Sequence, residues 1–210
     1  MKIVIVDYGI GNVRSIYNAF SYQGLNPILS NDSEVILNAD GLVLPGVGAF
    51  SHAMKNLIKY NLINIIKNYA KTGKPLLGIC LGMQLLLEES EEFGYTKGIG
   101  LIKGKVVKLP FNKSNQVKLP SIGWCGIKSN VVKWEKTILN EINLNSEMYF
   151  VHSFVSNVTD QNEILSVTDY YDFTFCSTLK KGNIYGCQFH PEKSSIVGLK
   201  IIKNFIDICK

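Results

Sequence analysis

The stretch GICLGMQLL, residues 78 to 86, places one cysteine between two glycines. The segment KPLLGIC (74–80) is an apolar run of strand length, and LGMQLLLEES (81–90) is typical of the helix that would follow it. A strand that turns sharply into a helix needs small residues on both sides of the turn, and Gly78 and Gly82 supply them. We therefore expect a strand, a tight turn at Cys80 and a helix.

The first half of the chain repeats this alternation of strand and helix. Helical spacing of apolar residues covers residues 12–24 and 54–69, and the second segment fits either one helix or two helices joined near Asn61. Short apolar runs typical of strands are KIVIVD (2–7), LNPILS (25–30) and DGLVLPG (40–46). Repeated strand–helix units favour a parallel sheet covered by helices on both faces.

The second half of the chain favours antiparallel strands. From Gly98 to Phe175 it consists mostly of short runs rich in Val, Ile, Tyr and Phe, separated by polar breaks. A buried strand, IYGCQFHP (184–191), and a closing helix end the chain. We predict a single α/β domain over residues 1–210 with three layers: a central, mostly parallel sheet flanked by helices, with an antiparallel strand insertion before its last strand.

Composition excludes several classes of function. The net charge of +5 is mild, and no block of basic residues is interleaved with aromatics, which argues against a nucleic-acid reader. No apolar run reaches the length of a membrane span, and the opening MKIVIVDYG fits a buried strand better than a signal peptide. The five cysteines form neither a disulfide framework nor a CxxC metal pattern. A reduced, cytoplasmic protein is the simplest interpretation.

The expected turn gives Cys80 the setting of a nucleophile. Its sulfur would lie at a helix N-terminus, where free N–H groups and the helix dipole favour a thiolate. The N–H of Leu81 would then face an oxyanion forming on a substrate carbonyl. A buried, inert residue is the commoner fate of a cysteine, but the two glycines and the position at a strand end favour a catalytic role here.

A thiol nucleophile needs a base, and His190 lies in GCQFHPEKS at the end of the last strand. The carboxyl ends of parallel strands form one rim, so we expect Cys80 and His190 to meet although they are far apart in sequence. Glu192 would hold the far nitrogen of the imidazole. His52 and His152 are weaker candidates, which we interpret as hydrogen-bonded structural residues.

The glycine-rich turn LPGVGAF (44–50) follows another expected strand. It lacks the lysine of a Walker motif, and no GxGxxG pattern follows the first strand, so phosphate binding is not favoured. Because the turn lies on the same rim as Cys80, a backbone N–H near Val47 is a candidate second donor to the oxyanion hole. A purely structural tight turn is the alternative.

Four segments resemble the motifs of the class I (triad) glutamine amidotransferases: GICLGMQLL, LPGVGAF, YFVHSF and GCQFHPEKS. The resemblance runs from the first strand to the last helix and implies Cys80 as nucleophile, His190 as base and acid, and Glu192 as the orienting carboxylate. It implies no metal or organic cofactor. The residues that it places around a bound glutamine are Gly48, Gln84, His152 and Ser153.

Within this family, IVDYGIGNVRSI and PGVGAF resemble the glutaminase subunits of imidazole glycerol phosphate synthases, which act in histidine biosynthesis. That resemblance implies a heterodimer with a (β/α)8-barrel synthase subunit that receives ammonia through a tunnel, with contacts near Asn12, Trp124 and Lys193. The segment LPSIGWCGI departs from the usual Pro-His-x-Gly-Trp-Asn at Ser121 and Cys125. Glutaminase subunits that feed sugar amidotransferases in surface-polysaccharide biosynthesis are therefore the alternative.

Three other classes fit the sequence less well. A cysteine peptidase on a similar sheet does not account for FHPEKS and GMQ, and glutamate release from glutamine, as opposed to peptide cleavage, would distinguish it. A non-catalytic relic should have lost a triad residue, whereas this chain retains all three. A nucleotide-binding module would need the phosphate-binding motif that is missing here.

Overall fold

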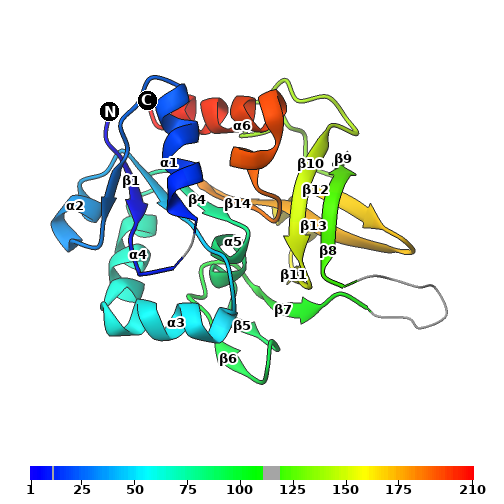
Figure 1. Ribbon diagram of the computed structural model, residues 1–210, viewed down its shortest axis with the longest axis horizontal. Coiled ribbons are helices and arrows are strands. Elements are labelled where there is room, and N and C mark those ends of the chain that lie inside the picture. The colour runs from blue at the N-terminus through cyan, green and yellow to red at the C-terminus, as the bar shows by residue number, and fades with distance from the viewer. Residues whose placement is uncertain (11, 111–118) are drawn as a thin grey trace.

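Eight strands form the central sheet of the computed structural model, which describes residues 1–10, 12–110 and 119–210 (Figure 1). Five of them pair in parallel in the order β2-β1-β3-β4-β14. Their bounds are Ile28–Ser30 for β2, Ile3–Val6 for β1, Gly41–Leu44 for β3, Leu76–Ile79 for β4 and Ile184–Cys187 for β14. The prediction of a mostly parallel sheet is confirmed.

Helices cover both faces of this sheet. Successive side chains of a strand point to opposite faces, and because both sets are apolar here, both faces must be buried. Ile3 and Ile5 pack into the same core as Phe20 and Phe205, whereas Val4 and Val6 pack into the core on the opposite face. The first core is covered by α1 (Val13–Tyr22) and α6 (Ser195–Ile208). The second is covered by α2 (Ser33–Leu37), α3 (Phe50–Lys59) and α4 (Leu62–Lys71). The prediction of three layers is therefore confirmed (Figure 1).

Residues 54–69 form parts of two helices, α3 and α4, and not one. Asn61 between them adopts a left-handed backbone with φ 57°. Asparagine tolerates this conformation better than most residues because its short polar side chain can bond locally, and one such residue is enough to interrupt the helix. The open alternative near Asn61 is thus decided in favour of two helices.

The helix expected over residues 81–90 is much shorter than predicted. α5 covers only Leu81–Leu85, and Glu89–Ser90 form the short strand β5. The carbonyls of Leu85, Leu86 and Leu87 accept hydrogen bonds from N–H groups of the segment 99–102, which passes over them. A distant part of the chain therefore takes the acceptors that a longer helix would have used.

The antiparallel insertion contributes to three sheets. Three of its strands widen the central sheet: β13 (Phe173–Lys181), β12 (Ile164–Tyr170) and β9 (Lys128–Ser129). A second sheet pairs β8 (Ser121–Gly126) with β10 (Glu147–His152). A third has the order β11-β7-β5-β6, where β11 is Phe154–Val158, β7 is Gly104–Lys108 and β6 is Thr96–Lys97. Two 3-10 turns are η2 (Gln161–Glu163) and η3 (Pro191–Lys193). Within the described residues, no helix has the length and apolar character needed to cross a bilayer.

Candidate active site

Cys80 occupies the turn between the end of β4 and the start of α5. Its backbone has φ 54° and ψ −111°, a conformation that L-residues rarely adopt. Such a residue costs on the order of 1–3 kcal/mol and persists only where its surroundings enforce it. One enforcing contact is the hydrogen bond from the Cys80 N–H to the carbonyl of Cys187 on the adjacent strand β14, at 2.7 Å.

The two glycines that flank Cys80 are required by close packing of the turn. A Cβ atom on Gly82 would overlap the carbonyl oxygen of Leu44 at the end of β3. A Cβ on Gly78 would lie 2.7 Å from the carbonyl oxygen of Gly82. Any side chain at either position would push the turn away from the sheet, so the spacing G-x-C-x-G holds the thiol at the strand end.

The parallel pairing of β4 with β14 brings His190 to Cys80. Ile79 pairs with Cys187, so the residues just beyond the two strand ends lie side by side. The Nδ1 of His190 lies 2.7 Å from the Oε1 of Glu192, and both side chains are at most 2% exposed. The His190 Nε2 is also buried and has no hydrogen-bond partner among the described residues. This nitrogen is therefore free to serve the thiol and a substrate.

The pKa of His190 reflects these neighbours. Burial acts to lower the pKa, but the interactions with Cys80 and with Glu192 outweigh burial and raise it to about 10. The ring is therefore protonated near neutral pH. An imidazolium in this position can give its proton to the leaving group of a reaction at Cys80.

A cavity of about 290 Å³ opens onto Cys80 and His190. Eight of the residues singled out in the sequence line it: Val47, Gly48, Cys80, Leu81, Gln84, His152, Ser153 and His190. Four separate segments of the chain supply them, and the carboxyl ends of β3, β4 and β14 bring three of these segments to one rim.

Comparison with known proteins agrees with this arrangement. The family model described as glutamine amidotransferase class-I matches residues 4–209. The chain belongs to the class I glutamine amidotransferases. The resemblance found in the sequence is thereby confirmed, and with it the expectation of an enzyme of this class.

Relatives of this amidotransferase span its whole length. The imidazole glycerol phosphate synthase subunit HisH of Methanosarcina barkeri is 47% identical over 208 residues, which is 99% of both chains. The protein of the same name from Aquifex aeolicus is 45% identical over 206 residues, 98% of this chain and 96% of its own. PurLQS from Thermotoga maritima has the same fold, with a TM-score of 0.73 at 18% identity, 100% coverage of this chain and 99% of the other.

Two polar residues in or directly beside the amidotransferase cavity were missed in the sequence. Gln188 is fully buried; its Nε2 lies 3.8 Å from the Cys80 sulfur, and its Oε1 accepts from the Nε2 of Gln84 at 3.0 Å. Glu92 lines the cavity, and its Oε2 accepts from the N–H of Phe50 at 2.6 Å. Gln188 lies in the same motif as His190, and this proximity in sequence could have indicated that Gln188 belongs to the site. Glu92 lies in the acidic run EESEEF, where nothing local separates it from solvated glutamates.

The other two histidines differ from each other. His152 is buried in β10, and its Nδ1 lies 3.1 Å from the carbonyl oxygen of Phe154, as a structural residue would. Burial is the main reason that its pKa falls to about 4, so the ring is neutral at pH 7. His52 is exposed on α3 and not buried in a strand, so the structural interpretation was wrong for it.

Trp124 and Lys193 meet around a third residue. The Trp124 ring is 48% exposed and packs against the Tyr149 ring at a centroid distance of 5.9 Å. The Lys193 Nζ lies 5.9 Å from the same Tyr149 ring. Asn12 is exposed at the start of α1, beyond the end of β1, and accepts from the Ser15 hydroxyl at 3.1 Å.

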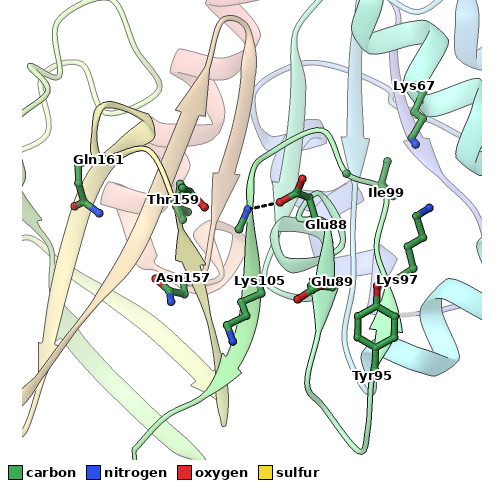
Figure 2. Close-up of a pocket in the computed structure, with 13 residues that line it drawn as sticks. Lys67, Glu88, Glu89, Tyr95, Lys97, Ile99, Lys105, Asn157, Thr159 and Gln161 are labelled. Atoms are coloured by element: carbon green, nitrogen blue, oxygen red, sulfur yellow. Dashed lines mark hydrogen bonds between the residues drawn. The ribbon is translucent and has the colours of Figure 1, made fainter.

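A larger, open groove of about 820 Å³ shares no lining residue with the Cys80 cavity (Figure 2). Its wall carries charged side chains of both signs, among them Lys97, Lys105 and Glu88, and Glu88 is already bonded to the N–H of Gly104 at 3.0 Å. Cysteine and histidine are missing from the described residues that line it. We assign the groove no part in the amidotransferase chemistry.

Proposed function

We propose that this chain is the glutaminase subunit of an imidazole glycerol phosphate synthase. It hydrolyses glutamine to glutamate and ammonia, and it passes the ammonia to a (β/α)8-barrel synthase subunit that makes imidazole glycerol phosphate and AICAR. The observation that carries the proposal is the shared cavity of Cys80 and His190, with Glu192 bonded behind the imidazole. Full-length relatives at 45–47% identity that bear this enzyme's name support the choice of pathway.

The first half of the reaction forms a thioester. The Cys80 sulfur attacks the side-chain amide carbon of glutamine, and the carbonyl oxygen becomes an oxyanion. The N–H groups of Leu81 and Val47, both on the cavity wall, stabilise that oxyanion. His190 then gives its proton to the leaving nitrogen, and ammonia departs as the carbon–nitrogen bond breaks.

The second half of the reaction releases glutamate. His190, now neutral, takes a proton from a water molecule, and the resulting hydroxide attacks the thioester carbonyl. The carbon–sulfur bond breaks and Cys80 returns to its starting state. Glu192 stabilises the imidazolium in both halves and keeps its Nδ1 proton on the side away from the substrate.

Gln84 is oriented to receive the substrate amide. Its Nε2 donates to the carbonyl oxygen of Phe154 at 2.9 Å and to the Oε1 of Gln188 at 3.0 Å. Both hydrogen atoms of the Gln84 amide are therefore used, which leaves its oxygen to accept from the NH₂ of a bound glutamine. The backbone of His152 and Ser153, between β10 and β11, supplies further polar groups on the opposite wall.

Glu92 is placed to bind the α-ammonium group of glutamine, and we expect Glu92→Gln to raise KM. The neutral amide still accepts from the Phe50 N–H, but it loses the charge that would pair with the ammonium. Because a hydrogen bond to a charged group contributes roughly 1.5–3 kcal/mol, the KM for glutamine should rise at least about tenfold. Steady-state kinetics would show this, and an unchanged KM would place the ammonium elsewhere.

We expect Glu192→Gln to weaken glutamine hydrolysis less than His190→Ala does. The glutamate orients and stabilises an imidazole that moves the protons itself, so its replacement leaves the proton carrier in place. Values of kcat measured for both variants with the same partner would test the order. Comparable losses would mean that Glu192 takes a direct part in the reaction.

The departures at Ser121 and Cys125 do not alter the exposed face of β8. Ser121 is buried and pairs with His152, and Cys125 packs against the core. Side chains alternate along a strand, and Ile122 and Trp124 on the other face remain 60% and 48% exposed. The surface that we assign to the synthase partner therefore keeps its tryptophan, which supports the histidine pathway over sugar amidation.

Transfer of labelled nitrogen tests the proposed function directly. The chain is mixed with a barrel synthase subunit and its acceptor, and glutamine labelled with ¹⁵N in its side-chain amide is supplied. Label should appear in imidazole glycerol phosphate, with equimolar release of glutamate. Glutamate release without transfer to this acceptor, but with transfer to a sugar acceptor, would support the alternative pathway.

A further inference from the structure

The turn that carries Val47 is held at both ends by side chains from distant segments. At its start, the hydroxyl of Tyr8 donates to the carbonyl oxygen of Pro45 at 2.5 Å. At its end, the carboxylate of Glu92 accepts from the N–H of Phe50 at 2.6 Å. The turn is open at Val47 and Gly48, because Val47 is 36% exposed and a Cβ on Gly48 would meet nothing within 4 Å.

Tyr8 contacts the turn and the Cys80 elbow together. Its side chain is fully buried just beyond the end of β1. A Cβ on Gly46 would lie 3.0 Å from the Tyr8 oxygen and 2.8 Å from both the Gly82 nitrogen and the Leu81 Cβ. The tyrosine hydroxyl, the glycine turn and the start of α5 are thus packed with no space for an additional methyl group.

The Tyr8 phenol is a neutral donor under ordinary conditions. Burial raises its pKa well above the usual value, and the nearby Cys80 raises it further. The Tyr8 backbone is held as well, because its carbonyl oxygen accepts from the Nδ2 of Asn56 at 3.0 Å. The hydroxyl therefore has a fixed position from which to hold the carbonyl of Pro45.

We propose that Tyr8 is a positioning residue for the oxyanion hole. Its hydroxyl fixes the plane of the Pro45–Gly46 peptide, because that peptide contains the bonded carbonyl. Only the two backbone dihedrals of Gly46 then separate this fixed plane from the peptide that carries the Val47 N–H. Glycine restricts these dihedrals least, so the external anchor limits where the donor can point. The proposal rests on the proposed function, in which the Val47 N–H stabilises the oxyanion.

The chain contains a matched control for this contact. Tyr69 on α4 is also fully buried, and its hydroxyl also donates to a proline carbonyl, that of Pro75, at 3.1 Å. Neither Tyr69 nor Pro75 lines the Cys80 cavity. Tyr8→Phe and Tyr69→Phe each remove one buried hydroxyl from the same kind of hydrogen bond, but only Tyr8→Phe releases the turn.

The test measures glutamine hydrolysis by the heterodimer with acceptor bound, together with the rate at which iodoacetamide alkylates Cys80. Alkylation displaces iodide and forms no oxyanion, so it reports on the thiol alone. For Tyr8→Phe we expect kcat to fall at least about tenfold, part of the hundredfold to thousandfold cost of one lost donor. KM and the alkylation rate should stay within about twofold of wild type. Tyr69→Phe should match wild type in all three measurements.

Three results would contradict the positioning role of Tyr8. In the first, Tyr8→Phe keeps wild-type kcat. In the second, it loses alkylation and hydrolysis equally, which would place its effect on the nucleophile. In the third, Tyr69→Phe loses kcat to the same extent, which would reveal general destabilisation. A wild-type heterodimer that releases no glutamate would reject the proposed function itself, and the anchor with it.

If Tyr8→Phe does not fold, a second variant tests the role of the hydroxyl. Tyrosine fluorinated at ring carbon 3 keeps the hydroxyl and the ring, and incorporated at position 8 it should preserve wild-type kcat. A fluorinated protein that folds but loses kcat about tenfold would contradict the role assigned to the hydroxyl. Melting temperatures of all variants show that each assay is run on folded protein.

Discussion

Replacing Cys80 with alanine is expected to abolish glutamine-dependent synthesis in the heterodimer while synthesis from added ammonium salt continues. The thiol produces ammonia and does not contact the acceptor, so an external supply of ammonia should bypass it. Cys80→Ser should behave in the same way, because serine has no comparable access to an anionic nucleophile here. Product formation with glutamine and with ammonium chloride, measured on the same preparations, gives the comparison.

A labelling experiment tests the nucleophile independently, with the other four cysteines as its control. Cys176 and Cys187 are buried, and burial is the main reason that their thiol pKa values lie well above the usual range. A glutamine analogue with an electrophilic group should therefore label Cys80 alone. Labelling of Cys125, or an equal loss of the glutamine and ammonium activities in an intact complex, would contradict the assignment of the nucleophile.

The second large effect concerns the partner. The isolated subunit should hydrolyse glutamine slowly, and binding of the synthase subunit with its acceptor should raise the rate on the order of a hundredfold to a thousandfold, the effect of one oxyanion donor. The physical basis is the open middle of the turn. The Val47 N–H belongs to the Gly46–Val47 peptide, which rotates about the ψ of Gly46 and the φ of Val47. Val47 is 36% exposed and Gly48 has free space around it, so this peptide has room to rotate between a position that faces the substrate and one that does not.

Docking near Asn12, Trp124 and Lys193 would favour one of these two positions. Release of ammonia without an acceptor wastes glutamine, so coupling of this kind protects the substrate. Glutamate release by purified subunit alone, with partner, and with partner plus acceptor gives the three rates. If the subunit alone matches the complete complex, the oxyanion hole is preformed and the switch does not exist.

The local order of the chain was readable from the sequence because it depends on neighbouring residues. Continuous apolar runs located the parallel strands, since both faces of each strand must be covered. The turn at Cys80 was also readable, because the need for Gly78 and Gly82 arises within five consecutive residues and leaves a visible spacing. Asn61 marked a junction for the same reason, as its own backbone conformation ends the helix.

The sequence by itself therefore determined the layers, the elbow and the candidates for the triad, all of which follow from short-range spacing or from strand ends. Only the tertiary structure decided where α5 ends, because the N–H groups that take its carbonyls come from residues 99–102. It alone placed Gln188 on the Cys80 sulfur, Glu92 on the cavity wall and Tyr8 under the turn. Each of these contacts joins residues that are far apart in sequence, and hydrogen bonds of this kind leave no local pattern.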